Sequence, residues 1–310
     1  MTAERNRIVT SFRLLTYANE AGTARPGIFV DSSVFDIGDE MAIHEASRLP
    51  YPDLEAALND WERAKPLFHR IADRPRTRPR SLEGLKLLAP LPRPAAIYCA
   101  AANYYDHARE YGQELVKEKL RPYFFIKSSS AVIGTGEPVR LPLDHSKKFD
   151  WEIEIAVVIG KAAANVSEKE AMSHVAGYTI MNDLSARDHN RRQDWPFVSD
   201  WFEHKSWETS APMGPWITMP EDISDVDNLS MKTWISGELM QNSSSSQMVF
   251  TIPEQIAYIS RQITLKPGEI IATGTCGGVG GPQGRFLSPG DDIRMEVEGV
   301  GVLANPVSAR

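Results

Sequence analysis

The sequence has few of the features that mark secreted, zinc-binding or membrane proteins. Its 310 residues include two cysteines, Cys99 and Cys276, too few for a disulfide framework and without the spacing of a zinc site. No run of about 18 apolar residues is present, so no membrane-spanning helix is expected. Residues 1–7 lack the apolar centre of a signal peptide. We therefore expect a cytoplasmic protein with no membrane partner.

Acidic residues outnumber basic ones, 41 to 34. The formal net charge is -7, so the basic face of a nucleic-acid-binding protein is not expected. The sequence has no Gly-x-Ser-x-Gly motif, and its glycine-rich stretch at 274–281 lacks the Gly-Lys-Ser/Thr of a phosphate-binding loop. These absences disfavour nucleic-acid binding, serine esterases and P-loop nucleotide hydrolases.

The first 90 residues are predicted to form a small α+β domain. Apolar residues at 12–18 indicate a strand, and the pattern at 27–37 indicates a hairpin. Asp53 can cap a helix, because the apolar residues that follow it have the spacing of one buried helical face. Together with the length of the chain, this pattern predicts one small domain followed by a larger one.

Residues 91–310 are expected to form the larger domain. A stiff proline-containing linker at 90–94 marks its boundary with the first. Capping boxes predict a helix at 167–177 and a second helix from Thr251, with Ile263 on its inward face. Short strands separated by glycine and proline turns are predicted at 95–100, 122–127, 150–160, 178–183 and 270–273. This pattern favours a β-rich α+β fold, either a sandwich or a barrel.

The strand at 150–160 carries the clearest chemical signal. Side chains alternate faces along a strand, so Glu152 and Glu154 share one face and lie roughly 7 Å apart along it. Two carboxylates on a face that continues with apolar residues suit a hard divalent cation. The alternative, which the pattern alone leaves open, is that the first half of the strand is exposed to water.

Asp183 is the natural third ligand of such an ion. It ends a buried-looking strand, where a carboxylate needs a partner or a metal. An all-oxygen site favours Mg²⁺, Mn²⁺ or Ca²⁺ over zinc or copper, and three protein ligands leave positions for water and substrate. An ordinary strand-end turn is the alternative interpretation. A second Glu-x-Glu pair, Glu296 and Glu298, has no aspartate after it and is predicted to be solvated.

His107, Glu110 and Lys205 are candidates for acid–base and electrostatic roles. His107 and Glu110 are three residues apart on a predicted helix, so they share a face and can form a general base with its orienting carboxylate. Lys205 beside a metal could hold developing negative charge. Each also has a simpler interpretation, a surface helix contact for the pair and a surface position for the lysine.

Taken together and in order, these motifs resemble the fumarylacetoacetate hydrolase family from about residue 95 to 307. The resemblance implies a β-rich core of the fumarylacetoacetase C-terminal type, usually dimeric, behind a small variable N-terminal domain. The matching segments are Asn103-Tyr104 with His107 and Glu110, Phe125-Ile126-Lys127, Trp151-Glu152-Ile153-Glu154, Asn182-Asp183-Leu184-Ser185-Ala186-Arg187-Asp188, Lys205-Ser206, Pro212-Met213-Gly214-Pro215 and Thr273-Gly274-Thr275.

The resemblance also implies roles for individual residues. Glu152, Glu154 and Asp183 match the divalent-metal ligands of the family. His107 and Glu110 match its catalytic dyad, and Lys205 matches its active-site lysine. Lys127, Arg187 and Thr275 are expected to bind substrate.

The activity that follows from this resemblance is metal-dependent, with Mg²⁺ as the expected ion and Mn²⁺ or Ca²⁺ as alternatives. We expect hydrolysis of a carbon–carbon bond in a β-diketo acid such as an acylpyruvate, with His107, steered by Glu110, deprotonating the attacking water. Decarboxylases, isomerases or tautomerases, and sugar-acid dehydratases or hydrolases are alternatives within the family. A protein that binds an oxo acid without turnover is a further alternative.

Overall fold

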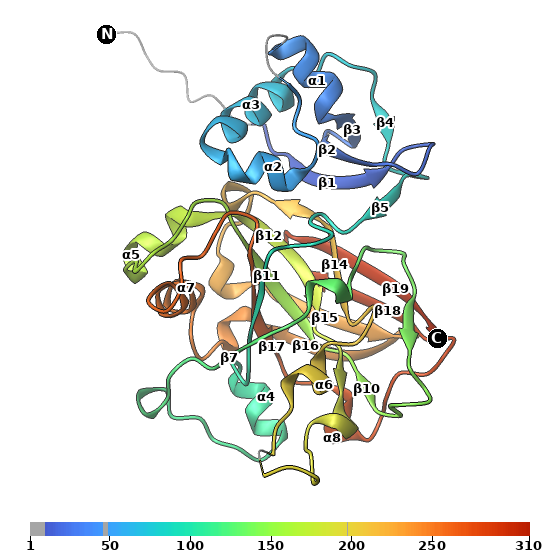
Figure 1. Ribbon diagram of the computed structural model, residues 1–310, viewed down its shortest axis with the longest axis vertical. Helices are drawn as coiled ribbons and strands as arrows, with labels where there is room; N and C mark the ends of the chain where they lie inside the picture. Colours follow the sequence, from blue (N-terminus) through green and yellow to red (C-terminus); the bar gives the residue numbers. More distant parts are fainter. Residues whose placement is uncertain (1–9, 46–48, 197) are drawn as a thin grey trace.

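The strand predicted at 150–160 lies in the middle of a twelve-stranded sheet. The computed structural model describes residues 10–45, 49–196 and 198–310, so the signal-peptide inference at residues 1–7 lies outside the described residues. The main path of the sheet runs β4 (Arg80–Ser81), β3 (Ser33–Asp36), β2 (Ala24–Val30), β1 (Arg13–Ala18), β14 (Ala211–Thr218), β12 (Val175–Asn182), β11 (Ile153–Ile159), β17 (Ile270–Thr275), β6 (Ile97–Ala100) and β7 (Phe124–Ile126) (Figure 1). Off this path, β5 (Lys86–Leu88) pairs with β1 and β8 (Val132–Ile133) pairs with β14.

A second sheet of five strands packs against the first. Its order is β16 (Glu238–Ser244), β15 (Ser230–Ile235), β18 (Asp292–Val297), β19 (Gly301–Ala309) and β9 (Val139–Leu141). Ile153 and Ile155 of β11 share one buried cluster with Met231 and Met295 of this sheet. Short strands β10 (Phe149–Asp150) and β13 (Ser185–Ala186) pair beside them. The predicted β-rich sandwich core is therefore confirmed.

Strand β11 is buried on both faces, which explains its apolar, β-branched sequence. It is antiparallel to β12 on one side and to β17 on the other. While Ile153 and Ile155 face the second sheet, Ala156 and Val158 belong to the apolar cluster that reaches the N-terminal unit. The alternation predicted for this strand is therefore correct, and the alternative of a strand half exposed to water is wrong.

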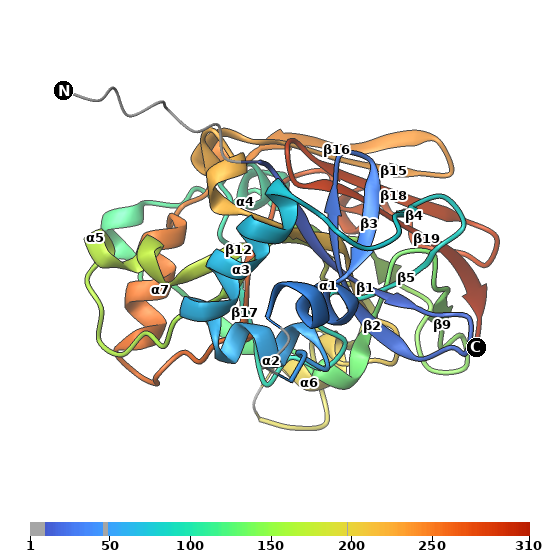
Figure 2. The same ribbon diagram turned by 90° about the horizontal axis from the view of Figure 1, so that it is seen from above.

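The N-terminal unit stacks on one end of the larger part and shares its sheet (Figures 1 and 2). Three helices cover its strands, α1 (Ile37–His44), α2 (Leu54–Asn59) and α3 (Trp61–Asp73). Asp53 caps α2 as predicted, accepting a hydrogen bond from the backbone N–H of Ala56. Strand β1 pairs with β14 through Arg13 and Leu14, so the sheet continues from the unit into the core. A domain boundary near residue 90 stays a prediction.

The helices of the larger part are short and lie at the ends and edges of the sheets (Figure 1). They are α4 (Tyr105–Glu110), α5 (Glu168–Ala171), α6 (Trp201–Lys205), α7 (Ile252–Ser260) and α8 (Gly280–Gln283). In the described ranges, we find no helix of the length and apolarity that crossing a membrane requires.

Two helix predictions need correction. The helix expected over 167–177 ends at Ala171, a 3-10 turn follows at Met172–His174, and β12 already begins at Val175. The change from helix to strand comes early because Val175 pairs with Ile159 of β11 in the sheet. Ile263 does not face inward: α7 ends at Ser260, and Ile263 is 52% exposed.

Asp36 is expected to be a main polar anchor of the N-terminal unit. Its buried carboxylate caps α1 and accepts hydrogen bonds from Arg25 (2.7 and 2.8 Å) and the Tyr17 hydroxyl (2.7 Å). Breaking a buried ion pair costs about 3–5 kcal/mol, and because Arg25 is partly exposed we expect Asp36→Ala to lower the free energy of unfolding by about 3 kcal/mol. Urea unfolding measures this, with the exposed Glu20→Ala as control.

The contribution of Asp36 depends on pH in a defined direction. Burial acts to raise the pKa of its carboxyl, but hydrogen bonds from Arg25 and Tyr17 bring the pKa below its usual value. The stabilisation is therefore complete above about pH 4, the ordinary pKa of aspartate, and is lost as the pH falls through the lowered value. A difference between wild type and Asp36→Ala that stays constant down to pH 2 would contradict this assignment.

Candidate active site

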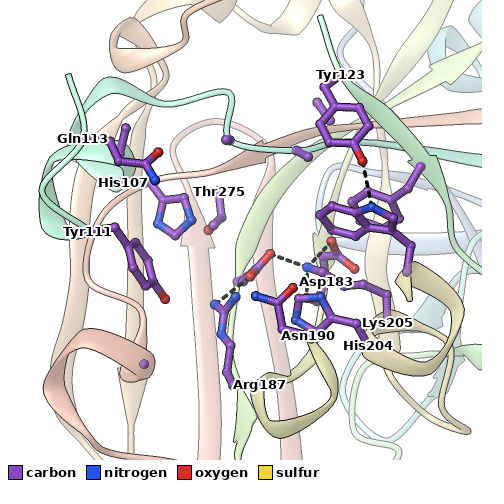
Figure 3. A pocket seen from close by; sticks show the side chains of 18 of the residues that line it. His107, Tyr111, Gln113, Tyr123, Asp183, Arg187, Asn190, His204, Lys205 and Thr275 are labelled. Carbon is purple, nitrogen blue, oxygen red and sulfur yellow. Dashed lines mark hydrogen bonds and ion pairs between the residues drawn. The ribbon is translucent and has the colours of Figure 1, made fainter. Parts of the chain in front are cut away.

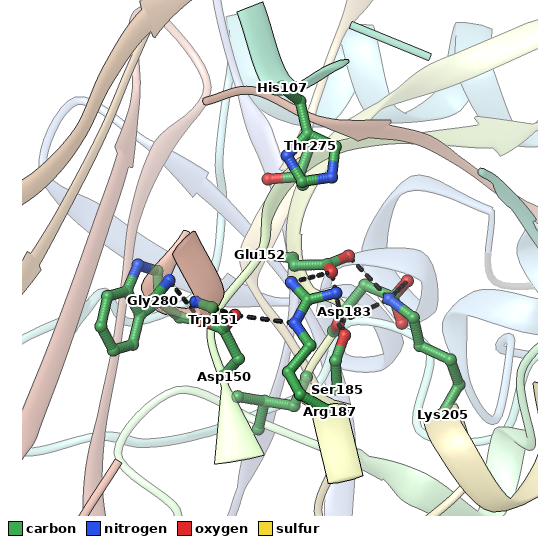
Figure 4. Close-up of polar contacts among 12 residues, drawn as sticks. His107, Asp150, Trp151, Glu152, Asp183, Ser185, Arg187, Lys205, Thr275 and Gly280 are labelled. Carbon is green, nitrogen blue, oxygen red and sulfur yellow. Dashed lines mark hydrogen bonds and ion pairs between the residues drawn. The ribbon is translucent and has the colours of Figure 1, made fainter. Parts of the chain in front are cut away.

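Three carboxylates from two adjacent strands meet at the end of the large sheet. Pairing of Ile153 with Asn182 brings Glu152 and Asp183 together, and the Asp183 backbone N–H donates to the Glu152 carbonyl at 2.9 Å. Glu152, Glu154 and Asp183 are all buried, and one oxygen from each lies within 4.8 Å of the others. The grouping inferred from the sequence is thus present in the fold (Figure 4).

The charges of this cluster suit a hard divalent cation. Burial raises the pKa of the Glu154 carboxyl well above its usual value, and the negative charges of Asp183 and Glu152 raise it further. Its Oε2 accepts a hydrogen bond from the Gly274 backbone N–H at 2.9 Å. A carboxyl held in this way becomes a stable carboxylate only when more positive charge is nearby. An all-oxygen donor set with an excess of carboxylates fits Mg²⁺ or Mn²⁺.

Lys205 lies directly against two of these carboxylates. Its Nζ is 2.6 Å from Glu152 Oε2 and 2.7 Å from Asp183 Oδ2. Burial acts to lower the pKa of Lys205, but Asp183 and Glu152 raise it above its usual value, so the amine is an ammonium. The predicted neighbourhood of Lys205 and the acidic cluster is therefore present, and the interpretation as a surface lysine is wrong.

Lys127, which we predicted to bind substrate, contacts Asp183 and does not line the described cavity. Its Nζ is 2.8 Å from Asp183 Oδ1 and donates to the Leu184 carbonyl at 3.0 Å. The side chain is fully buried and is absent from the described residues that line the cavity. The Lys127 ammonium contacts Asp183 and a backbone carbonyl on the side of Asp183 away from the cavity. In this position Lys127 can orient the Asp183 carboxylate. Contact of Lys127 with substrate is not supported by this placement.

Arg187 lines the cavity and is tied to the acidic cluster. Its Nε donates to Asp150 at 2.8 Å, and its Nη2 lies 2.7 Å from Glu152 Oε1. Asp150, which the sequence reasoning missed, also accepts from the Gly280 and Gly281 backbone N–H groups at 2.7 and 2.9 Å. A carboxylate directly before the Trp-Glu-x-Glu segment was the available signal for it.

His107 and Glu110 form a dyad on helix α4. Figure 3 shows His107 at another wall of the cavity. The His107 Nδ1 lies 2.5 Å from Glu110 Oε1, which leaves Nε2 for a substrate. Glu110 Oε2 accepts from the Gly278 backbone N–H at 2.8 Å, so the glycine-rich loop fixes the orienting carboxylate. Burial acts to raise the pKa of the Glu152 carboxyl, but Lys205 and Arg187, followed by His107, bring that pKa below its usual value.

Thr275 reaches the cavity from β17 and is held by a residue that the sequence did not reveal. Its Oγ1 accepts from the Gln241 Nε2 at 2.9 Å. The buried Gln241 side chain also accepts from the Ile153 backbone N–H at 3.1 Å, directly beside the acidic cluster. Gln241 comes from β16 of the second sheet, and no local pattern marks it.

The cavity that these groups line has a volume of about 550 Å³. Six of the predicted site residues line it, namely His107, Glu152, Asp183, Arg187, Lys205 and Thr275, whereas Glu110, Glu154 and Lys127 lie behind them. Figure 4 shows His107 and Thr275 on one side of the space and Lys205 with Asp183 on the other. The arrangement can bind an anionic substrate through its oxygen atoms and transfer a proton to or from that substrate.

The comparisons with known proteins agree with this geometry. The model of the fumarylacetoacetate (FAA) hydrolase C-terminal domain matches residues 96–308. The chain belongs to the fumarylacetoacetate hydrolase family. The mitochondrial oxaloacetate tautomerase fahd2 of Xenopus laevis is 39% identical over 229 residues, which cover 73% of this chain and 70% of the relative.

Solved structures of the same family share the whole architecture. A putative HpcE protein from Mycobacterium smegmatis has a TM-score of 0.81 at 31% identity, covering 96% of this chain and 99% of that one. Maleylpyruvate hydrolase from Sphingobium, solved with manganese and pyruvate, has a TM-score of 0.75 at 28% identity and covers 96% and 99%. The fold class and family expected from the motifs are confirmed, and the relatives are enzymes that include tautomerases, hydrolases and isomerases.

Proposed function

We propose that this protein is a metal-dependent enzyme that enolises a 2-oxo acid, and specifically an oxaloacetate keto–enol tautomerase. The observation that carries the proposal is one cavity with a histidine–glutamate dyad at one wall and an ammonium with three carboxylates at another. Similarity to the oxaloacetate tautomerase of Xenopus laevis supports the choice of substrate.

The chain's own groups supply the proton transfer. His107, oriented by Glu110, would take a proton from C3 of the keto form through Nε2. The C3–H electron pair becomes the C2–C3 double bond, and the 2-oxo oxygen takes the negative charge and then a proton from solvent, while His107 releases the C3 proton to solvent. The Lys205 ammonium is positioned to stabilise that charge. A divalent cation held by Glu152, Glu154 and Asp183 would add positive charge at the same oxygen.

Hydrolysis of a carbon–carbon bond in an acylpyruvate is the second candidate, as the sequence predicted. The dyad favours it, because a His–Glu pair that removes a proton from carbon can also remove one from water. The structural similarity to maleylpyruvate hydrolase supports it too. Both reactions develop an enolate at the same end of the substrate, so Lys205 would serve both.

A substrate panel with metal removal tests the proposal. Oxaloacetate enol is added to the protein, and its ultraviolet absorbance is followed against the uncatalysed rate in the same buffer. We expect acceleration that a chelator abolishes and added Mn²⁺ or Mg²⁺ restores. In parallel, fumarylpyruvate and maleylpyruvate are assayed by pyruvate release. Pyruvate release without enol conversion would favour the second candidate, and turnover unaffected by the chelator would reject both.

The dimer implied by the family resemblance remains a proposal as well. Light scattering coupled to size-exclusion chromatography measures the mass directly, and we expect twice the 34.6 kDa of one chain. A monomer at micromolar concentration would contradict it without affecting the assignment of the site.

A further inference from the structure

His204 is a buried side chain in the cavity wall with no role in the chemistry described so far. It belongs to α6, next to Lys205, and is 3% exposed. Both of its ring nitrogens are buried and lack a hydrogen-bond partner among the residues that the structure describes. Figure 3 shows the ring among the residues that line the cavity, on the side of Lys205 and Asp183.

Such a ring has an unused capacity for binding. A buried polar group without a partner costs free energy, and in proteins it is normally satisfied by protein, water or ligand. The neighbouring charged groups do not satisfy it, because Lys205 and Arg187 are engaged by Glu152, Asp183 and Asp150. The partner that completes His204 therefore comes from the contents of the cavity.

His204 is also held as a neutral imidazole. Burial lowers its pKa to about 2, helped by the positive charges of Lys205 and Arg187. A neutral imidazole has one N–H donor and one acceptor nitrogen, so it can donate to an anion without adding a charge. Bonds from a neutral donor to an ionised acceptor are among the stronger hydrogen bonds in proteins.

The surroundings of His204 fix the ring in place. Its centroid lies 5.7 Å from that of the Trp201 indole, which stacks on Phe125 at 4.6 Å. The Trp201 Nε1 donates to the Tyr123 hydroxyl at 2.8 Å, so this indole is itself anchored. His204 is thus a polar side chain within a mainly aromatic part of the cavity wall.

The charge of the cavity indicates which ligand group His204 meets. Three cationic side chains line the space, Lys148, Arg187 and Lys205. Lys148 is exposed and forms no ion pair within the part of the chain that the structure describes. Because Lys205 and Arg187 are already paired with carboxylates, Lys148 and the His204 N–H remain available to a further carboxylate of the ligand, which favours a dianion over a monoanion.

We infer that His204 is a substrate-binding residue that donates a hydrogen bond to the second carboxylate of an oxo diacid, the carboxylate that is not attached to the 2-oxo carbon. This inference rests on the proposed function, because it assigns the 2-oxo end to Lys205 and the acidic cluster. It makes His204 a specificity residue, which selects dicarboxylic substrates over monocarboxylic ones of the same reacting group.

Two dead-end ligands test this assignment without turnover. Malate and lactate are 2-hydroxy acids that cannot enolise through a 2-oxo group, and malate differs from lactate by the second carboxylate. Calorimetry of the manganese-loaded protein gives the dissociation constant of each. Wild type should bind malate more tightly than lactate. In His204→Phe, which keeps an aromatic ring but removes the donor, malate affinity should fall about tenfold and lactate affinity should change by less than about twofold.

The conservative variant and the fold check complete the design. His204→Gln restores an N–H donor and should recover most of the preference for malate, which a purely packing role would not predict. Lactate binding and the thermal midpoint report whether each variant folds. Equal affinity of wild type for both ligands, failure of both to bind, or an unchanged malate preference in His204→Phe would overturn the inference. Absence of tautomerase turnover in wild type would instead reject the proposed function, since these binding constants do not depend on turnover.

Discussion

Replacing His107 with alanine is expected to lower kcat by about 10²- to 10⁴-fold, the range in which a positioned general base contributes. The reason is specific to this site. Glu110 holds Nδ1 of His107, so Nε2 is the atom available to the substrate, and no second base takes its place at that wall of the described cavity. Stopped-flow or steady-state rates of enol conversion measure the loss.

A measurement of metal affinity distinguishes the loss of the base from a general disruption of the active site. The acidic cluster comes from β11 and the end of β12, whereas His107 comes from α4, so His107→Ala should bind Mn²⁺ with unchanged affinity. Glu110→Gln should give a smaller loss, because the base remains and only its orientation suffers. His174→Ala serves as a matched control, since His174 lies outside the cavity lining. Retention of more than a tenth of the wild-type kcat in His107→Ala would argue that another group is the base.

Replacing Glu154 with glutamine is expected to abolish metal-dependent activity while leaving the fold stable. Burial and two neighbouring carboxylates raise the pKa of Glu154 well above its usual value, so its negative charge is disfavoured when no metal is bound. An uncharged amide of the same shape therefore costs little in the metal-free protein. A divalent cation, in contrast, loses one of its three carboxylate ligands. Calorimetric titration with Mn²⁺, together with thermal unfolding, measures both effects.

The chain offers a control for this change in its second Glu-x-Glu pair. Glu298 is exposed and Glu296 is paired with Arg294 at 2.7 Å, as expected for the solvated pair predicted from the sequence. Glu298→Gln should leave Mn²⁺ affinity, kcat and stability at wild-type values. A Glu154→Gln protein that binds Mn²⁺ as tightly as the Glu298→Gln control would mean that the ion is held elsewhere.

The acidic cluster was predictable because two local rules act in the same place. Alternation along β11 placed Glu152 and Glu154 on one face, and a carboxylate directly after a buried strand marked Asp183. In the fold, the antiparallel pairing of Ile153 with Asn182 brings Asp183 next to the two glutamates. The helical spacing of His107 and Glu110 worked for the same reason, because three residues along a helix fix a contact.

Other parts of the site depend on contacts that no local pattern encodes. Gln241 reaches Thr275 from the second sheet, and Lys127 reaches Asp183 from behind across 56 positions in the chain, so only the fold sets their roles. The helix predicted over 167–177 failed similarly, since pairing of Val175 with β11 overrode the helical tendency of the segment. From the sequence, His204 was only a candidate histidine of an iron site near Asp183 that no further motif supported, and its unpartnered ring nitrogens are visible only in the fold.

The origin of the dyad and of the acidic cluster in different parts of the chain bears on how such a protein can diversify. The acidic cluster is built into paired central strands, where a change of one residue disturbs the packing on both faces. Helix α4 lies in the connection between β6 and β7 and meets the glycine-rich loop through Glu110. Substitutions in that connection can therefore alter the proton-transfer groups without disturbing the packing around the acidic cluster.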